Sequence, residues 1–388
     1  MSQRIRIAYL VDSIEDPLRG TVSHVRRLTQ TLDRTEFFPH VLVMNDDPSD
    51  RRLQGFTCRI ERLGYQDRHP LAALRARLRL QRYMREHRCD VVCAYDRTAR
   101  IAGLPIARSV HSGLCIGVVR DMGQDLNPDD LVRLRRSNKI VHRFVASSAA
   151  AANRLMRQER VFRDWIDIIP EATPLEASSL RTDDQCLDAR HSFGLSMHEP
   201  VILVHGAFES WTDRTMILDA LEYLVEHHPN LRCVMMGRGR PHIIADVRAA
   251  AEQRALERQI VIADDPQLYD RWILAANVGV TASLYEGAAD ALLRFMAVGL
   301  PVVATSSGDN PEIVSHGRTG YLVEPREADA LAMRIHLLLV ADDVIRDFTV
   351  AARESVRNEF SDTLEAKRYS DYFRTLVYSQ LQGFERIA

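Results

Sequence analysis

The sequence predicts an α/β protein made of two open, parallel sheets, each covered by helices. Short apolar runs alternate with longer amphipathic stretches through most of the 388 residues, and this rhythm is typical of parallel strands joined by crossover helices. A polar, turn-rich segment interrupts the alternation near the middle of the chain, and the alternation then restarts. The length is sufficient for two domains, each with its own buried core.

The first half contains about seven predicted strands, each a short run of apolar residues bounded by polar or turn residues. They are expected at 5–11, 41–44, around 60, and at 91–93, 116–119, 144–146 and 166–169. Helices are expected between them, including 23–32 and 71–87, because apolar and charged residues recur there at helical spacing.

A linker is expected at 171–190, where the pattern dissolves into polar and turn residues. The second half then predicts strands at 201–206, 231–236, 260–263, 277–283, 302–305 and 321–323, and it is helical from about 327 to near the end. We therefore place a first domain at 1–175, a second at 176–360 and a C-terminal helix at 361–388.

Composition narrows the possible partners and the compartment. The net charge of −2 balances 51 basic against 53 acidic residues, so a nucleic-acid partner is not expected. Six scattered cysteines indicate reduced thiols. Neither a signal peptide nor an apolar run long enough for a bilayer is recognised in the sequence. A cytoplasmic protein is expected, with peripheral contact at the inner face of the membrane as an additional hypothesis.

The segment 281–323 is the most informative part of the chain. It predicts an apolar strand followed at Ser283 by a turn and a helix. Such a junction directs free backbone N–H groups and the positive end of the helix dipole toward a ligand, which favours phosphate.

This segment resembles the donor-binding half of the retaining glycosyltransferases of family 4 in the stretches SLYEG, MAVGLPVVAT, NPEIV and GRTGYLVEP. The resemblance extends over nearly the whole chain. It implies the GT-B fold, in which two Rossmann-like domains face each other across a cleft and the last helix crosses back to the first domain. It also implies a nucleotide-sugar co-substrate, no metal and no other cofactor.

The resemblance places the donor at the second domain. Glu286 matches the first of two glutamates in the family pattern, but Arg294 stands at the position of the second. Two phosphate-binding cations of the family are replaced by Ala207 and Thr212. The candidate donor-binding residues are Gly206, Arg214, Gly237, Arg238, Tyr285, Gly287 and Arg294. The alternatives are an N-cap role for Glu286 and solvated surface positions for the arginines.

The first domain is expected to hold the acceptor. Gly20 and Thr21 match the family's glycine-rich turn, and Arg120 and Asp121 stand where the family often has a histidine. The candidate catalytic residues are Glu286, Arg120 and Asp121. His24 and His111 are interpreted as structural, and no metal-binding motif is recognised. Residues 71–87 are rich in arginine, which is compatible with a contact to anionic lipid or with a solvated crossover helix.

The expected function is transfer of a sugar from a nucleotide-sugar to an acceptor hydroxyl with retention. The acceptor could be a glycan, a lipid-linked molecule or a small molecule. Loss of the loop cations and of the second glutamate leaves open a catalytically degenerate scaffold in glycan biosynthesis. A phosphorylase or an epimerase on the same fold is a third hypothesis.

Overall fold

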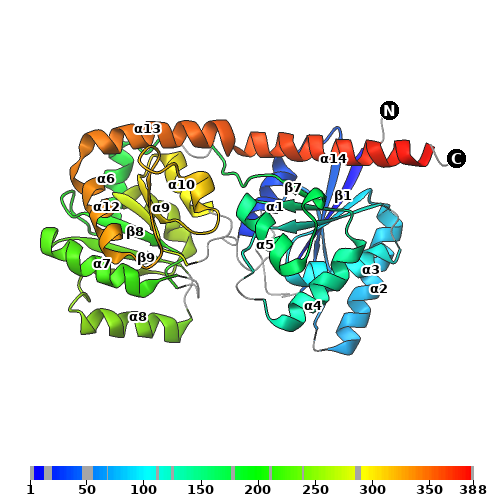
Figure 1. Ribbon diagram of the computed structural model, residues 1–388, viewed down its shortest axis with the longest axis horizontal. Helices are drawn as coiled ribbons and strands as arrows, with labels where there is room; N and C mark the ends of the chain where they lie inside the picture. The colour runs from blue at the N-terminus through cyan, green and yellow to red at the C-terminus, as the bar shows by residue number, and fades with distance from the viewer. Residues whose placement is uncertain are drawn as a thin grey trace. The chain divides into compact units, whose positions relative to one another are not determined.

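The computed structural model describes residues 4–12, 20–45, 56–67, 69–110, 113–123, 126–175, 180–208, 212–237, 240–284 and 290–385. The chain forms two compact units (Figure 1). Unit 1 consists of Met1–Glu171 together with Asp362–Ala388, and unit 2 consists of Ala172–Ser361. The C-terminal helix therefore belongs to the same unit as the N-terminal half of the chain.

In the described part of unit 1, seven parallel strands form one sheet in the order β3-β2-β1-β4-β5-β6-β7, which confirms the predicted parallel sheet. The strands are β1 (Ile5–Val11), β2 (Phe37–Val43), β3 (Arg59–Arg62), β4 (Val91–Ala94), β5 (Leu114–Val119), β6 (Arg143–Ala146) and β7 (Ile166–Ile168). Tyr9 at the centre of β1 pairs with Val41 of β2 on one side and with Cys93 of β4 on the other.

Helices cover both faces of this sheet. The helices of unit 1 are α1 (Gly20–Thr31), α2 (Pro70–His87), α3 (Leu104–Arg108), α4 (Pro128–Ser137), α5 (Ala149–Glu159) and α14 (Asp362–Glu385), with short helical turns at Ala99–Gly103, Asn138–Ile140 and Arg163–Trp165. One core lies between the sheet and α1 with α14, where Leu28 and Phe373 are buried. A second core lies under α2, α3 and α5, where Leu80 and Leu155 are buried.

The described part of unit 2 contains six parallel strands in the order β10-β9-β8-β11-β12-β13. They are β8 (Val201–His205), β9 (Arg232–Met236), β10 (Ile260–Ala263), β11 (Val278–Thr281), β12 (Val302–Thr305) and β13 (Tyr321–Val323). The helices are α6 (Asp183–Ser192), α7 (Arg214–His227), α8 (Pro241–Gln253), α9 (Tyr269–Ala275), α10 (Asp290–Val298), α11 (Asn310–Ile313), α12 (Ala328–Val340) and α13 (Asp342–Glu359), with a 3-10 turn at Pro266–Leu268.

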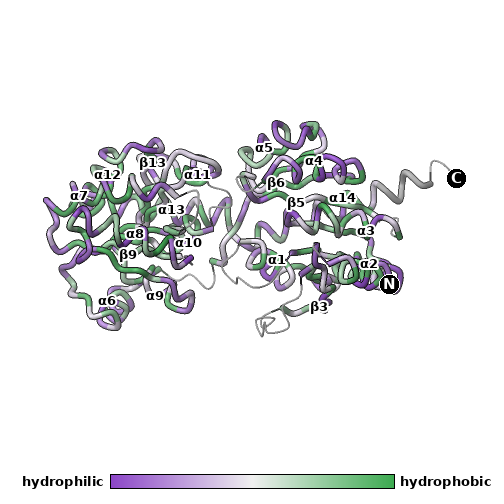
Figure 2. The backbone as a smooth tube through the Cα atoms, turned by 90° about the horizontal axis from the view of Figure 1, so that it is seen from below, coloured by the Kyte–Doolittle hydropathy of each residue, from purple (hydrophilic) through white to green (hydrophobic). Residues whose placement is uncertain are grey.

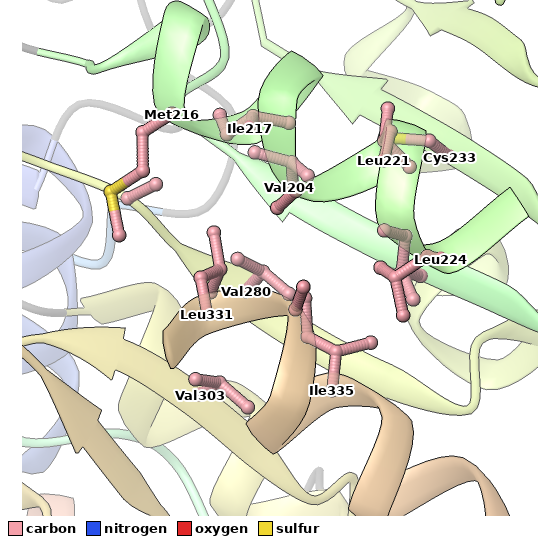
Figure 3. Packing of buried hydrophobic residues seen from close by; sticks show 14 of the residues in the cluster. Val204, Met216, Ile217, Leu221, Leu224, Cys233, Val280, Val303, Leu331 and Ile335 are labelled. Carbon is pink, nitrogen blue, oxygen red and sulfur yellow. The ribbon is translucent and has the colours of Figure 1, made fainter. Parts of the chain in front are cut away.

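The core of unit 2 forms where α7 and α12 pack on this sheet. Leu221 of α7 and Ile335 of α12 are buried together with Val204 and Val280 from the two central strands (Figure 3). In both units the hydrophobic segments concentrate on the strands, and hydrophilic ones mostly lie on the surrounding helices and turns (Figure 2). Because helices cover both faces of each sheet, the strands are buried on both sides and are apolar along their length.

The prediction of a linker over 171–190 is wrong for its second half, which contains most of α6. Thr182 caps this helix: its side chain accepts from the backbone N–H of Gln185, whose own side chain accepts from the backbone N–H of Thr182. Only Ala189 and Arg190 of α6 are buried. The cap stabilises this short helix. Because its apolar residues do not recur at helical spacing, the sequence did not predict it.

The chain enters and leaves unit 2 at adjacent positions. Thr173 pairs with Ser361 as an isolated parallel bridge, and the backbone N–H of Thr173 donates to the carbonyl of Phe360 at 2.9 Å. Immediately beyond these two points, Glu171 and Asp362 belong to unit 1.

Candidate functional site

Both sheets have the strand order of a doubly wound fold, in which the order reverses between the first and fourth strands. This switch point lies between β1 and β4 in unit 1 and between β8 and β11 in unit 2. In open α/β sheets, ligands bind outside the carboxyl ends of the strands at such a point. The residues that follow these four strands are therefore the first candidates for binding.

In unit 2, hydroxyl groups tie the ends of β11 and β12 together. The Thr305 hydroxyl accepts from the backbone N–H of Ser283 at 3.0 Å and donates to the Ser283 carbonyl at 2.7 Å. The Ser307 hydroxyl donates to the same carbonyl at 2.7 Å. Because all three residues are buried, these bonds hold the start of the segment that leads to residue 285 in a fixed position.

Ala207 and Thr212, the two positions at which the resemblance leads us to expect cations, have structural contacts. The backbone N–H of Ala207 donates to the Met236 carbonyl, and the Thr212 hydroxyl donates to the Gly206 carbonyl at 2.6 Å. Both residues are buried. Gly206 has a φ of 66°, a backbone conformation that favours glycine. The loop after β8 thus turns sharply without placing a cation at these two positions.

His205 ends β8 at the switch point and was not singled out by sequence reasoning, because it reads as the last residue of an apolar run. Burial, together with the charge of Arg294, lowers the pKa of His205 to about 4. Its ring lies edge-on to Phe295, with 6.4 Å between the ring centroids. Within the described residues, its Nδ1 atom is buried and has no hydrogen-bond partner. The imidazole is therefore neutral at neutral pH and has a free polar atom.

Two of the predicted donor-binding arginines lie in the described part of the chain. The guanidinium of Arg294 on α10 donates to a carboxylate oxygen of Asp270 on α9. Arg214 is the first residue of α7, where the side chain of Asp213 caps the helix by accepting from the Met216 backbone N–H at 3.0 Å. Arg294 is thus paired within unit 2 and lies close enough to influence His205.

The remaining donor-side predictions divide into one described residue and four that are not described. Gly237 follows β9 with a φ of 150°, and a Cβ atom built there would lie 3.6 Å from the Ala207 nitrogen. Four predicted residues lie outside the described residues, namely Arg238, Tyr285, Glu286 and Gly287. His111 of the first domain also lies outside them.

In unit 1, two aspartates meet at the switch point between β1 and β4. The Asp96 carboxylate accepts from the Asp12 backbone N–H and from the Thr21 hydroxyl, each at 3.0 Å. The Asp12 carboxylate accepts from the backbone N–H groups of Thr98 and Ala99 at 2.9 and 2.6 Å. Burial and the neighbouring Asp12 raise the pKa of Asp96 to about 6. The predicted acceptor-side residue Thr21 is thus joined to a carboxylate pair that sequence reasoning missed, and Gly20 begins α1 beside it.

Unit 1 also contains a buried cluster of charged side chains. Arg27 donates from Nε to Glu365 at 3.1 Å and from Nη2 to Glu171 at 2.9 Å. Arg120 donates from both Nε and Nη2 to Glu171, at 2.8 Å for Nε. His24 Nδ1 lies 3.1 Å from Glu365 and 3.6 Å from Glu171. We call these five residues the buried ionic cluster.

The electrostatics of the cluster favour charged carboxylates. Burial alone would raise the pKa of Glu171, but Arg120, His24 and Arg27 hold it well below its usual range. Against the same effect of burial, His24 and Arg27 lower the pKa of Glu365. The arginines thus stabilise the charged forms of both acids.

Arg120 and Asp121, the two candidate catalytic residues of the first domain, have separate partners. Arg120 is buried against Glu171, whereas Asp121 is exposed. The Asp121 carboxylate accepts from the Gly123 backbone N–H at 2.7 Å and lies 3.6 Å from Arg154. Glu171 holds the Arg120 guanidinium in the buried interior, whereas the Gly123 backbone and Arg154 hold the Asp121 carboxylate, so the two side chains are separated.

One group of side chains in the described residues has the geometry of a metal site, although none was recognised in the sequence. Potential ligand atoms of His24, Glu171 and Glu365 lie within 4.8 Å of one another. Arg27 and Arg120 already bind both carboxylates, so these atoms fit an ion-pair network better than a cation site. His24 also lies 3.2 Å from the Tyr95 hydroxyl, which agrees with a structural role.

No helix within the described residues combines the length and the apolar composition needed to cross a bilayer. All six cysteines are free thiols.

Two family descriptions match the chain. Residues 18–177 match "Glycosyltransferase Family 4", and residues 199–341 match "Glycosyl transferases group 1". The first match contains helix α1 and the strand end at Arg120, and the second contains His205 and the switch point of unit 2. Together the two matches cover most of the chain.

Curated relatives are similar over parts of their length. A D-inositol 3-phosphate glycosyltransferase of Streptomyces scabiei is 25% identical over 59% of this chain and 54% of its own length. A putative colanic acid biosynthesis glycosyltransferase, WcaL of Salmonella typhimurium, is 32% identical over 28% of this chain and 26% of its own length. The chain thus spans about half or less of these two relatives.

Solved structures match over nearly the full chain. Anabaena Alr3699/HepE, solved in complex with UDP and glucose, superposes with a TM-score of 0.84 at 16% identity, covering 96% of this chain and 100% of its own. A glycosyltransferase from Rickettsia africae has a TM-score of 0.80 at 18% identity, covering 96% and 99% of the two chains. At this identity the likeness shows the fold.

Proposed function

Because the chain belongs to glycosyltransferase family 4 and has the GT-B fold, we propose that it transfers a sugar from a nucleotide-sugar donor to an acceptor hydroxyl in glycan or glycolipid assembly. The observation that carries this proposal is the switch point of unit 2. There the loop after β8 turns at Gly206, and the neutral imidazole of His205, whose Nδ1 atom has no hydrogen-bond partner among the described residues, lies within the influence of the Arg294 charge. A cytoplasmic location is part of the proposal.

The donor diphosphate would bind at the carboxyl edge of unit 2. Two phosphate groups require cations and backbone donors, and Ala207 and Thr212 supply no cation there. Arg214 and Arg294 are the described residues that we assign to this role. The other proposed donor contacts are Gly206, Gly237, Arg238, Tyr285, Glu286 and Gly287.

To bind the donor diphosphate, Arg294 must exchange its present partner for a phosphate group. Its guanidinium is bound to Asp270, and Asp270 is largely exposed. An exposed ion pair of this kind contributes little to stability, so a diphosphate can compete for the guanidinium at low cost.

We propose transfer with retention. The bond between the anomeric carbon and the phosphate oxygen breaks, and the acceptor oxygen bonds to that carbon on the same face. The acceptor proton passes to the leaving phosphate oxygen. Glu286 would contact the transferred sugar, and Thr21 with Gly20 would lie on the acceptor side. Arg120 is assigned as a positioning residue because Glu171 occupies its guanidinium. Asp121, at the same strand end, is left as the exposed catalytic candidate of unit 1.

Isothermal titration with UDP, GDP and ADP tests the donor site directly. We expect one of the three to bind, and Arg294→Gln to weaken that binding by about tenfold, because a charge-assisted hydrogen bond contributes about 1.5–3 kcal/mol. Arg248→Gln, at an exposed position of α8, is the matched control. If none of the three nucleotides binds, the donor site is refuted.

A degenerate scaffold is the less favoured alternative, because the relatives from Streptomyces scabiei and Salmonella typhimurium and the structure from Rickettsia africae are all named as glycosyltransferases. Slow hydrolysis of the bound nucleotide-sugar that disappears in Glu286→Ala would contradict a scaffold. Circular dichroism of the variant checks that its fold is retained.

A further inference from the structure

Helix α2 has an apolar stripe on its outward face. Leu71, Leu74 and Leu78 are exposed by 71%, 51% and 57%, and their spacing of three and four residues puts them on one side of the helix. Leu80 and Met84 are buried on the opposite side, in the core of unit 1. A crossover helix needs only its inner face to be apolar, so packing within unit 1 does not explain the three outer leucines.

Arginines surround this stripe. The exposed side chains of α2 include Arg75, Arg77, Arg79, Arg82 and Arg85. Glu86 is the one acidic residue in the sequence of α2, and it is paired with Arg82 at 2.6 Å. The outward face therefore combines apolar side chains with a net positive charge, which is the composition of helices that lie in the interface of an anionic bilayer.

We propose that α2 docks unit 1 on an anionic membrane surface, with Leu71, Leu74 and Leu78 inserted among the lipids and the arginines at the phosphate groups. A second copy of the chain fits less well, because two α2 helices facing each other would bring their arginines together. Burial of three leucines supplies the apolar part of the binding, and the arginines supply the charge complementarity.

The position of the leucines on α2 extends the proposal to the acceptor. Helix α2 follows β3, and all strands of this sheet are parallel, so the first turns of α2 lie toward the carboxyl edge of the sheet. Thr21 and the Asp12–Asp96 pair lie at the same edge. Docking through Leu71 and Leu74 would bring this edge to the membrane surface. This step rests on the proposed transfer function and identifies the acceptor as a molecule with a lipid anchor.

Vesicle sedimentation without nucleotide or acceptor tests docking separately from transfer. We expect binding to vesicles of phosphatidylcholine with phosphatidylglycerol, weak binding to phosphatidylcholine alone, and a decline with added salt. The triple variant Leu71→Ser, Leu74→Ser, Leu78→Ser should bind these vesicles at least about tenfold more weakly. Each of the single variants Arg75→Gln, Arg79→Gln and Arg82→Gln should weaken binding to these vesicles about fivefold.

Matched controls come from unit 2. Met333→Ser with Val340→Ser and Val350→Ser removes three equally exposed apolar side chains, and Arg248→Gln with Arg318→Gln and Arg357→Gln removes three exposed arginines. Both control variants should bind like the unaltered protein. Docking through α2 is overturned if the unaltered protein does not bind anionic vesicles, if the leucine variant binds equally well, or if light scattering shows a dimer that this variant dissociates.

The acceptor assignment has its own readout. Transfer to a lipid-anchored acceptor in anionic vesicles should slow about tenfold in the leucine variant, while transfer to the same acceptor without its anchor should not change. Equal slowing of both reactions contradicts the assignment. Absence of any transfer in the unaltered protein, with vesicle binding intact, refutes the proposed function and leaves the docking surface standing.

Discussion

Arg27 donates a hydrogen bond to Glu365 at 3.1 Å, although the two residues stand 338 positions apart in the chain. The same guanidinium also binds Glu171, the last residue before the chain enters unit 2. A single side chain of α1 thus holds both the segment that leads out of unit 1 and the helix that returns to it.

Arg27→Met should destabilise unit 1 by about 3–5 kcal/mol, because it leaves buried carboxylates with too little positive charge. Urea unfolding followed by circular dichroism measures this loss. Arg374→Met is the control, since Arg374 also joins α14 to the rest of unit 1 but pairs with Glu36 at an exposed position. That variant should change the free energy of unfolding by less than about 1 kcal/mol. Equal losses in both variants would contradict the special role of the buried ionic cluster.

His205 should make unit 2 less stable as the pH falls from about 6.5 to about 4. Its folded pKa of about 4 is below its unfolded value, so the unfolded state binds the proton more strongly. Over this pH range, proton binding therefore stabilises the unfolded state relative to the folded state. The full effect is up to about 3 kcal/mol. His205→Gln should remove this part of the pH dependence, and His227→Gln, at an exposed position of α7, should not. A ring that titrates near its ordinary pKa by NMR would refute the prediction.

The charge of Arg294 contributes to the low pKa of His205. Arg294→Gln should therefore raise the His205 pKa, and Asp270→Asn should not raise it, because the positive charge remains. Histidine NMR titration of the two variants compares these shifts directly. This measurement requires no ligand, so it tests the geometry of the switch point independently of donor binding.

Asp96 should oppose folding above about pH 6. Its folded pKa of about 6 is above its unfolded value, so the folded state binds the proton more strongly and is favoured as the pH falls. Asp96→Asn removes the buried charge, and its stability relative to the unaltered protein should be greater at pH 8 than at pH 5, by about 1.4 kcal/mol. Asp129→Asn, at an exposed position of α4, should show no such difference between the two pH values.

The sheets of both units could be predicted because buried parallel strands are apolar along their whole length. The strand at Val302–Thr305, for example, is a short apolar run, and such a run is typical of a buried strand or of a buried piece of helix. Helix α6 was missed because its stability comes from the Thr182 cap and not from an apolar face.

The site was harder to predict than the fold. The family pattern indicated Thr21, Gly206 and Arg294, but it could not show that Arg294 is bound to Asp270. The buried ionic cluster joins residues from four distant segments, and no local pattern in a single sequence connects such positions. His205 was hidden for another reason, since its importance depends on an unpartnered Nδ1 atom that only coordinates reveal.

The bridge between Thr173 and Ser361 has a practical consequence. Because the two ends of unit 2 are hydrogen-bonded neighbours, unit 2 is an insertion within unit 1, and residues 172–361 should tolerate excision as an independent fragment. Conversely, a short glycine-containing loop joining residue 171 to residue 362 should close the remaining chain without strain. The nucleotide affinity of the first fragment and the vesicle affinity of the second can then be measured on separate molecules.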